Sequence, residues 1–417
     1  MSKAIFEKNL RTISGFEEIP QNWSTTVVGD LCVIGRGRVI SQEEIDRHPG
    51  PYPVFSSQTS NKGEMGRIDT FDFDGEWVTW TTDGANAGTV FHRSGQFNCT
   101  NVCGTLKPKS INSLDLTFLQ YHLGRIAKNY VSYIGNPKLM NEVMGRVAFA
   151  LPSYPQQRKI SRILTTVDNL IEKTESLIAK YQAIKQGMMH DLFTRGVDDN
   201  GHLRPPQTEA PDLYKQSELG WIPKGWDEGT IEDYCDIHNH LRFPISSEQR
   251  EQMQGDYPYY GPTGVFDWLD HYRVEGEYAL IGEDGDHFLK YASRPMTILT
   301  SGRFNVNNHA HLLVGKNGCG TEWVFAYYCH RDIKNHLTHQ GAGRLKLNKS
   351  ALRAMPLVVP KPAEQKLICE RFRSLKARVS TEQTQLNKLR SAKSGLMQDL
   401  LSGTVRVKVE QVEEARR

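Results

Sequence analysis

The sequence lacks any hydrophobic run that could cross a membrane. No stretch approaches the roughly 18 consecutive apolar residues that a transmembrane helix needs, and hydrophobic residues make up only 38% of the chain. The first residues, MSKAIFEKNLRTISGF, contain no apolar core of the kind found in secretory signal peptides. We therefore expect a cytoplasmic protein. A chain of 417 residues is also too long for one hydrophobic core, so we expect two to four domains.

Cysteine is scarce and shows no metal-binding spacing. The seven cysteines include no CxxC pair, and the closest two, Cys99 and Cys103, have no second Cys/His pair at a zinc-site distance. We interpret all seven as buried thiols and expect no metal site. Neither sign of charge is in excess: 51 basic and 48 acidic residues give a net charge of +3. This balance does not by itself indicate a nucleic-acid partner, and only local basic patches could do so.

Catalytic motifs are absent as well. The phosphate-binding pattern GxxxxGK followed by Ser or Thr does not occur, and neither does the methyltransferase signature, Asn or Asp before Pro-Pro-Tyr/Phe. GxSxG and HExxH are also missing. The stretch GRGR (35–38) lacks the strand–GxGxxG–helix context and is better interpreted as a turn. We therefore expect no catalytic residues and no cofactor bound by this chain.

What the sequence does contain is a long internal duplication. Ile, Pro, Trp, Cys and a final Ile coincide between 19–34 and 222–237, at an offset of 203 residues. Further matches are GQFNCTN (95–101) with GRFNVNN (302–308) and KQGMMHDLF (185–193) with KSGLMQDLL (393–401). A period of about 205 residues is far longer than that of solenoid repeats. The chain therefore consists of two tandem copies of one unit.

Each copy begins with a segment rich in Gly, aromatic residues, Thr and Val. Short apolar runs that end in turn signals predict strands, namely WVTWTTDG (77–84), YALIGEDG (278–285) and HAHLLVG (309–315). Helical patterns interrupt them at LTFLQYHLGRIAKNYV (116–131) and EWVFAYYCHRDIKNHL (322–337). Each segment is thus expected to form a globular α+β domain with an irregular sheet.

Polar clusters in these segments do not build a metal site. His336 and His339 lie three residues apart, but no carboxylate or cysteine set accompanies them, so we interpret them as part of a polar helix face. The acidic run Glu283-Asp284-Asp286 is of the type that binds Mg²⁺, yet the first copy conserves only Asp83 of it. A turn is the better interpretation.

Each copy ends in a long heptad pattern, over 154–193 and 362–401. Apolar residues recur at alternating steps of four and three, and the second series follows the first at an offset of 208 without insertion. Pro155 and Pro362 lie where each helix would begin. The pattern predicts two long helices that pack along this seam. The seam residues are Ile160, Leu164, Val167, Ile171, Ile178, Tyr181, Met188 and Leu192, then Ile368, Phe372, Leu375, Val379, Leu386, Leu389, Leu396 and Leu400.

An alternative is that each helix belongs to its own domain without contacting the other. Forty helical residues span roughly 60 Å at 1.5 Å per residue, which is longer than a compact domain needs. Mutual packing is therefore favoured, with Thr174/Glu382 and Lys185/Lys393 as polar seam positions that fix the register. Gly187 and Gly395 occupy equivalent points of the helices, and there we expect a close backbone approach or a local bend.

Cationic residues stand beside Asn, Gln and aromatic residues in both globular segments. Such combinations suit phosphate contacts and the reading of base edges, although most surface cations are simply solvated. The candidate DNA-binding residues are Arg36, Arg38, Lys62, Arg67 and Arg93 in the first segment and Arg242, Lys290, Arg294, Arg303, Arg344 and Lys346 in the second.

Taken together, the repeats resemble the specificity (S) subunit of type I restriction–modification systems. The resemblance covers the chain from about 15 to 405. It is carried by the order, spacing and duplication of four stretches: LPSYPQQRKISRIL (151–164), SELGWIPKGWDE (217–228), VPKPAEQKLI (359–368) and KSGLMQDLLSGTVRV (393–407).

The resemblance implies an α+β fold with two tandem target recognition domains, each followed by a long helix, the two helices pairing as an antiparallel coiled coil. Each domain would read one half of a split, asymmetric DNA site, and the coil would set the spacing; half-sites one turn apart are about 34 Å apart on DNA. The subunit would hold two methyltransferase (M) subunits, which bind S-adenosylmethionine. Restriction/translocase (R) subunits, which use ATP and Mg²⁺, would join them.

The sequence departs from the family pattern in two places. Gln156-Gln157 stands where the family, like Glu364-Gln365 here, prefers Glu-Gln. GNPKLMN (135–141) matches less well than QGAGRLKLN (340–348), so the end of the first domain is expected to be built differently.

The resulting domain prediction follows the chain from end to end. It comprises an N-terminal segment (1–19), recognition domain 1 (20–150), spacer helix 1 (151–196), a linker (197–221), recognition domain 2 (222–357), spacer helix 2 (358–403) and a tail (404–417). Two alternatives stay open: an enzyme that acts alone, which the missing motifs disfavour, and a stand-alone coiled-coil DNA-binding or interaction protein without modifying partners.

Overall fold

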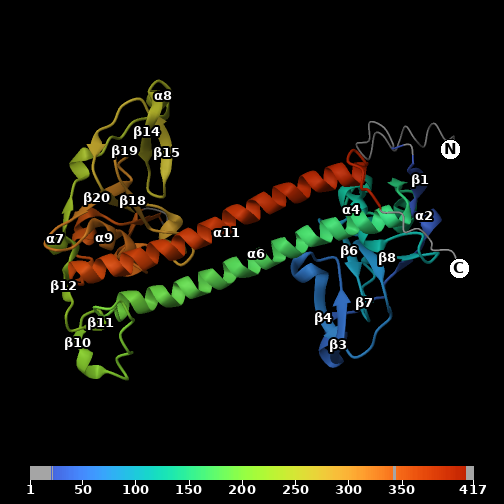
Figure 1. Cartoon of the computed structure of the whole chain (residues 1–417), viewed down its shortest axis with the longest axis horizontal. Coiled ribbons are helices and arrows are strands. Elements are labelled where there is room, and N and C mark those ends of the chain that lie inside the picture. Colours follow the sequence, from blue (N-terminus) through green and yellow to red (C-terminus); the bar gives the residue numbers. More distant parts are fainter. Residues whose placement is uncertain (1–19, 21, 341–343, 410–417) are drawn as a thin grey trace. The chain divides into compact units, whose positions relative to one another are not determined.

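A computed structural model describes residue 20 and residues 22–340 and 344–409 of the chain (Figure 1). The chain divides into two compact units. One comprises residues 1–175 and 384–417, and the other residues 176–383. The long helices α6 (Tyr154–Thr194) and α11 (Pro362–Ser402) each contribute one part to either unit. Both helices predicted from the heptad pattern are thus confirmed to within a residue or two at each end.

The first globular domain contains three small sheets. Strands β2, β8, β5 and β6 form an antiparallel sheet in that order, β4, β3 and β7 form a second, and β1 pairs with β9. Its strands are β1 (Ser24–Val27), β2 (Cys32–Arg36), β3 (Pro49–Phe55), β4 (Glu64–Ile68), β5 (Trp77–Thr81), β6 (Val90–Arg93), β7 (Asn98–Cys99), β8 (Cys103–Pro108) and β9 (Ala148–Leu151). Its helices are α2 (Val28–Leu31), α3 (Gln42–Arg47), η1 (Ser60–Gly63), α4 (Leu116–Ile126), η2 (Ala127–Tyr130) and α5 (Asn141–Gly145).

The second globular domain repeats this plan. The sheets β13-β20-β17-β18 and β15-β14-β19-β16 and the pair β12–β23 correspond to the three sheets of the first domain. Its strands are β12 (Asp227–Thr230), β13 (Cys235–Ile237), β14 (Gln254–Tyr260), β15 (Val265–Leu269), β16 (Val274–Glu275), β17 (Tyr278–Gly282), β18 (Thr297–Thr300), β19 (Arg303–Val306), β20 (Ala310–Gly315), β21 (Thr338–Gln340), β22 (Arg344–Lys346) and β23 (Pro356–Val359). Its helices are α7 (Ile231–Tyr234), η4 (Asn239–Leu241), α8 (Ser247–Glu251), η5 (Asp286–Lys290), α9 (Thr321–Tyr328), η6 (Lys334–His336) and α10 (Lys349–Arg353).

Between α6 and β12 the chain forms η3 (Pro211–Leu213) and a hairpin of β10 (Tyr214–Ser217) and β11 (Gly220–Pro223). The predicted linker, 197–221, covers most of this segment, and its bounds stay a prediction. Its first residues pack on the start of α11. The amide of Val197 donates to Glu364 Oε1 at 2.9 Å, and Arg204 forms an ion pair with the same carboxylate. The second copy therefore uses Glu364 for a contact that Gln156 does not make, since Gln156 accepts from the amide of Ser153.

The duplication extends to backbone detail. In both domains a parallel strand pair places an asparagine beside the central strand, with Val54 opposite Asn98 and Tyr259 opposite Asn305. Both strands β3 and β14 carry a register shift at a glycine. A Cβ at Gly50 or Gly255 would lie 2.3 Å from the Cα of Asp69 or Asp270. Only glycine permits this approach, so the repeated glycine fixes the irregularity of both sheets.

A buried glutamine explains why a similar sequence recurs at the start of both long helices. Gln157 donates to the carbonyl of Pro152 at 2.9 Å, and its Oε1 accepts from the amide of Asp115 at 2.8 Å. Gln365 donates to the carbonyls of Pro360 and Gly318 at 2.7 and 2.8 Å and accepts from the amide of Gly320 at 2.8 Å. Each glutamine thereby joins the first turn of a long helix to the start of the short helix, α4 or α9, in the domain before it.

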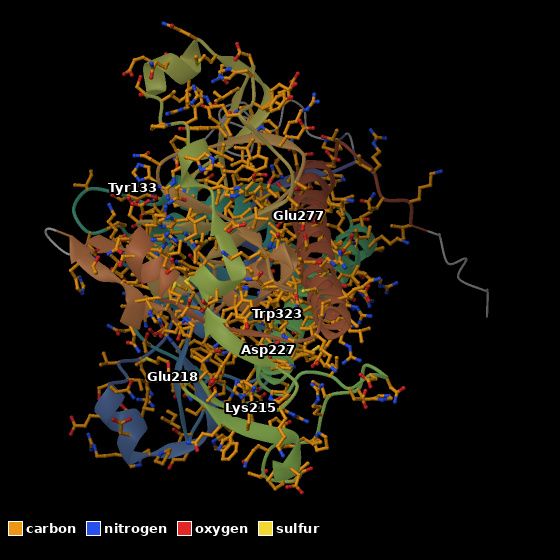
Figure 2. The ribbon with its side chains drawn as sticks, turned by 90° about the vertical axis from the view of Figure 1, so that its left-hand side faces the viewer. Tyr133, Lys215, Glu218, Asp227, Glu277 and Trp323 are labelled. Carbon is orange, nitrogen blue, oxygen red and sulfur yellow. The ribbon has the colours of Figure 1, made fainter. Side chains whose placement is uncertain are left out.

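Each unit has its own hydrophobic core, and both long helices enter it. In the first unit Ile160 and Leu164 of α6 share a core with Leu400 and Leu401 of α11. In the second, Leu192 and Phe193 share a core with Ile368 and Phe372 around the buried Trp323, which is labelled in Figure 2. Residues late in one helix thus meet residues early in the other, so the two helices are antiparallel in each unit. The α+β class and the pairing of the long helices are confirmed.

Three sequence predictions need correction. Helix α9 ends at Tyr328, well before the predicted 337, because the carbonyl of Cys329 accepts from the amide of Met296 in the adjoining strand segment. His336 and His339 do not share a helix face, since His336 lies in η6 and His339 in β21. A Cβ built on Gly187 or Gly395 meets no described atom within 4 Å beyond its own stretch of helix, so neither glycine marks a close backbone approach, and the alternative of a local bend stays a prediction. The expected strands at 77–84, 278–285 and 309–315 and the helix from Leu116 are confirmed.

All seven cysteines are buried free thiols, as predicted. In the described part of the chain, no group of three His, Cys, Asp or Glu side chains could hold a metal ion. No helix among the described residues combines the length and apolarity that crossing a bilayer requires.

Candidate nucleic-acid interface

The predicted cations of the first domain lie beside carboxylates. Arg38 Nε lies 3.0 Å from Asp72 Oδ2, and its Nη1 lies 2.6 Å from Glu44 Oε1. The hydrogen bond to Glu44 raises the pKa of Arg38 further above its usual value. Arg67 pairs with Glu64 at 2.8 Å, and the more exposed Lys62 approaches Glu172 at 3.4 Å. These pairs are largely solvent-exposed, so each contributes little to stability and could exchange for a phosphate contact.

Arg93 differs from the other four because its side chain is buried. Its guanidinium lies 3.6 Å from the ring centre of Phe55 and 4.4 Å from that of Phe91. It donates to Thr79 Oγ1 at 3.2 Å and to the carbonyl of Lys62 at 2.8 Å. Burial lowers its pKa to about 10. These contacts make Arg93 part of the interior, where it holds the Lys62 loop against the sheet.

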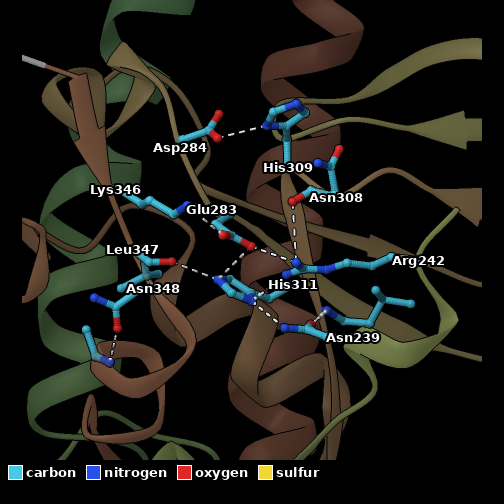
Figure 3. A network of polar contacts seen from close by, with 12 residues as sticks. Asn239, Arg242, Glu283, Asp284, Asn308, His309, His311, Lys346, Leu347 and Asn348 are labelled. Atoms are coloured by element: carbon cyan, nitrogen blue, oxygen red, sulfur yellow. Dashed lines mark hydrogen bonds and ion pairs between the residues drawn. The ribbon is translucent and has the colours of Figure 1, made fainter. Parts of the chain in front are cut away.

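The predicted cations of the second domain are distributed less evenly. Lys290 and Arg294 are exposed, whereas Arg303 pairs with Glu275 at 3.3 Å and covers the ring of Tyr272 at 4.7 Å. Arg344 begins β22, and its side chain lies outside the described residues. Arg242 and Lys346 belong to one polar network, which Figure 3 shows from close by.

Glu283 is the centre of this network. Its carboxylate lies 2.7 Å from Arg242 Nη1 and 3.3 Å from Lys346 Nζ. Arg242 Nη2 also contacts His311 Nδ1 at 2.6 Å, and the other ring nitrogen of His311 lies 2.8 Å from the carbonyl of Leu347 (Figure 3). The network therefore joins β17, β20, η4 and the chain that follows β22. It orders the end of the domain rather than presenting free cations.

The protonation states within the network follow from its burial. Burial lowers the pKa of His311 to about 4, and the neighbouring Arg242 cation acts in the same direction. Burial alone would raise the pKa of Glu283, but the net shift is downward. Because His311 is uncharged at neutral pH, Arg242 and Lys346 supply the positive charge that keeps Glu283 ionised.

The first domain has a smaller carboxylate cluster one position further along the chain. Asp83, the counterpart of Asp284, lies 3.8 Å from Arg36 Nη2 and 4.0 Å from Lys138 Nζ, while Thr82 occupies the position of Glu283. Lys138 and Lys346 are equivalent, because the next residue after each makes the same backbone hydrogen bond. The amide of Leu139 donates to the carbonyl of Thr82, and the amide of Leu347 donates to that of Glu283. Lys138 was missed by sequence reasoning. The duplication indicates this residue, since the Lys-Leu of GNPKL (135–139) recurs in GRLKL (343–347) at the offset of 208.

Acidification is expected to destabilise the second domain through His311. The unfolded chain titrates near pH 6.5, while the folded pKa of His311 is about 4. Between these values the unfolded state binds more protons than the folded state. The contribution of neutral His311 to the free energy of unfolding is therefore complete above about pH 6.5 and is lost as the pH falls toward 4. We expect a loss of about 3 kcal/mol in the free energy of unfolding.

Chemical denaturation at pH 7.5 and pH 4.5 measures this loss. The variant His311→Gln should lose clearly less over the same interval, whereas His240→Gln, which removes an exposed histidine of the same domain, should behave like the unchanged protein. An equal loss in His311→Gln would show that His311 is not the group responsible.

Exposed aromatic residues of β15 were also missed. Phe266 and Trp268 are 61% and 49% exposed on this strand. Arg250 pairs with Asp267 at 2.9 Å and covers Phe266 at 4.7 Å from the ring centre. Phe266 and Arg250 border a cavity of about 430 Å³ that Asn307, Asn308 and His309 also line. The signal was present as alternating VFDWL, in which the aromatic residues fall on the face opposite Leu269.

The same strand position carries different chemistry in the two domains. Arg67 of β4 lies opposite Pro53, and Trp268 of β15 lies opposite the equivalent Pro258. Both side chains are about half exposed. One backbone plan therefore presents a cation in the first domain and an indole in the second.

The predicted seam residues of α6 and α11 are all buried or half-buried, as are Thr174, Glu382, Lys185 and Lys393. Within the first unit the polar seam position Lys393 meets a carboxylate, at 2.6 Å from Asp168. Within the second, the rings of Phe193 and Phe372 lie 6.5 Å apart. The pairing of each individual seam residue stays a prediction.

Comparison with known proteins identifies the family. The family described as the type I restriction modification DNA specificity domain matches residues 20–181 and again residues 223–391. The chain belongs to this family. The two matches follow the two repeats, and members of the family are the recognition components of their systems rather than the catalytic ones.

Similarity to individual proteins of this family agrees with the assignment. The chain is 48% identical over 143 residues to the N-terminal part of a type I specificity subunit from Mycoplasma pneumoniae, covering 34% of this chain and 76% of the relative. It is 23% identical to the specificity subunit of the type I restriction enzyme MjaVIII from Methanocaldococcus jannaschii, covering 96% of this chain and 97% of the other. The solved S subunit from M. genitalium matches with a TM-score of 0.66 at 17% identity, over 92% of this chain and 97% of that one. At this identity the last similarity shows the fold alone.

Proposed function

We propose that each globular domain of this specificity protein reads one half of an asymmetric, bipartite site in double-stranded DNA. The domains correspond to the predicted ranges 20–150 and 222–357. Helices α6 and α11 set the spacing between the two halves. The chain holds two methyltransferase subunits and joins them to restriction/translocase subunits in the cytoplasm. S-adenosylmethionine, ATP and Mg²⁺ belong to these partners.

The observation that supports two independent readers best is the contrast between Arg67 and Trp268. Equivalent strands, paired with equivalent prolines, carry a cation in one domain and an indole in the other. An arginine can donate two hydrogen bonds to guanine, while an exposed indole offers only an apolar face and one donor. Domains with a common scaffold and different exposed side chains are what separate half-sites require.

The proposed DNA contacts come from the exposed cations rather than from the whole predicted set. Lys62, Arg67, Lys290 and Arg294 are the most accessible, and Arg36, Arg38 and Arg303 could exchange an ion pair for a phosphate. Lys346 stays within the network of Glu283. Arg242 is held by Glu283, and Arg93 is buried, so neither is proposed as a direct contact. We assign these two a positioning role.

Domain exchange tests the proposal. Replacing residues 20–150 by the corresponding domain of another family member, in a chain co-expressed with its methyltransferase subunits, should change one half of the methylated motif and leave the other half intact. The reciprocal replacement of 222–357 should change only the other half. Sequencing that detects modified bases across the host genome gives the readout.

Two outcomes would contradict the proposal. If one exchange changed both halves of the motif, the domains would not read independently. If the chain bound DNA but never copurified with a methyltransferase subunit, a stand-alone binding protein would be the better description.

A further inference from the structure

The two units differ sharply at one equivalent position of the paired helices. In the first unit Lys393 Nζ of α11 lies 2.6 Å from Asp168 Oδ1 of α6, and Tyr121 donates to the same carboxylate at 2.6 Å. The offset of 208 that relates the helices takes Lys393 to Lys185 and Asp168 to Lys376. The second unit therefore has a lysine where the first has the neutralising carboxylate.

Lys185 is a half-buried cation without a carboxylate. Its Nζ lies 2.9 Å from His330 Nε2, while His330 Nδ1 lies 2.8 Å from the carbonyl of Tyr291. Because Nδ1 must donate to that carbonyl, Nε2 accepts from Lys185, and the ammonium retains two further protons. Burial lowers the pKa of Lys185, and the charge of Lys376 lowers it further. The exposed Lys376 thus repels the half-buried Lys185.

A cavity of about 840 Å³ opens beside this pair within the second unit. Lys185, Gln182 and Gln186 line it from α6, Ser293 from the chain after η5, and His330 and Arg331 from the chain after α9. Val379, one turn along α11 from Lys376, also lines it, as do apolar and aromatic residues such as Met189, Phe193 and Tyr327. The lining includes no Asp or Glu. Among the described residues, no carboxylate forms an ion pair with Lys185, Lys376 or Arg331.

We propose that this cavity binds a phosphate group, carried either by inorganic phosphate or by a small nucleoside phosphate. An oxyanion placed against Lys185 would receive its two remaining donors, and the hydroxyl and amide groups of the rim would supply further hydrogen bonds. It would also neutralise Lys185, the lysine of the lining, and reduce its repulsion with Lys376 nearby on α11. The volume suits a ligand of nucleotide size. The inference does not depend on the proposed DNA reading, because every residue involved lies within the second unit.

The first unit has Asp168 where the second has Lys376, and this difference suggests the variant that tests the proposal. Lys376→Asp recreates in the second unit the pair found at Lys393 and Asp168. It should fold at least as stably as the unchanged chain and lose phosphate binding by a factor of ten or more. Lys180→Asp makes the same change of net charge at an exposed position of α6 outside the cavity. This control should bind phosphate like the unchanged chain.

Titration calorimetry of the full chain at constant ionic strength, with phosphate, AMP and adenosine in turn, gives the affinities, and the unfolding temperature confirms that each variant folds. Saturating phosphate should raise that temperature by about 2–4 °C in the unchanged chain. Tighter binding of AMP than of phosphate identifies a nucleotide, and equal binding identifies the free ion. Unaltered phosphate binding in Lys376→Asp or Lys376→Gln, or an equal loss in Lys180→Asp, overturns the proposal. Absence of binding to the unchanged chain also overturns it.

Discussion

Inserting one heptad into both long helices is expected to lengthen the unread gap of the recognised DNA site by about 3 base pairs. The insertions belong between Glu175 and Ser176 and between Gln383 and Thr384, where the chain divides into its two units. Seven residues add about 10 Å of helix, which equals about 3 base pairs at 3.4 Å each. They also preserve the 3.5-residue seam on both sides of the insertion.

Controls separate a change of length from a change of rotation. Inserting five residues into both helices adds about 7.5 Å but rotates the helix faces by about 140°. Methylation should then be lost rather than shifted. A heptad inserted into one helix alone should also abolish methylation, because the seam residues lose their partners. A gap that stays unchanged after the double heptad insertion would show that the helices do not set the spacing.

The second large effect is expected from the buried glutamines at the helix starts. Gln365→Ala removes three hydrogen bonds and leaves the carbonyls of Pro360 and Gly318 and the amide of Gly320 without a side-chain partner. Each buried group left unsatisfied costs about 1–3 kcal/mol. We therefore expect the free energy of unfolding to fall by about 3–5 kcal/mol. Gln157→Ala should act similarly in the first unit, where its longest contact, to Ser113, measures 3.4 Å.

Chemical denaturation measures both losses, and Gln385→Ala is the matched control. Gln385 is an exposed position of α11, where alanine is slightly the better helix former. Its replacement should leave stability unchanged or raise it slightly. A loss below about 1 kcal/mol in both buried variants would mean that water or neighbouring groups replace the glutamine, and that the repeated helix start has another cause.

The features predicted well from the sequence are those that repeat along the chain. The long helices follow from an apolar period sustained over many turns, and the two-domain plan follows from paired stretches such as GQFNCTN and GRFNVNN. The structure explains that pair: Asn98 and Asn305 lie buried beside the parallel strand pair and donate to the carbonyls of Thr70 and His271, both at 2.7 Å.

The features predicted poorly depend on contacts between distant residues. Nothing local distinguishes Arg93 from Arg67, yet Phe55 and Phe91 enclose the first, whereas the second is about half exposed and pairs with Glu64. The end of α9 depends on the amide of Met296, more than 30 residues away. The glycines Gly187 and Gly395 recur at equivalent positions, but the structure reveals no close contact that explains the recurrence.

The most direct test of the account is to co-express the chain with its methyltransferase subunits and to map every methylated site in the host genome. Two domains of common plan and different surface, joined by antiparallel helices, predict a single asymmetric motif: two unlike halves separated by a gap of fixed length and free sequence. A continuous motif, a palindromic motif or a gap of variable length would contradict the account.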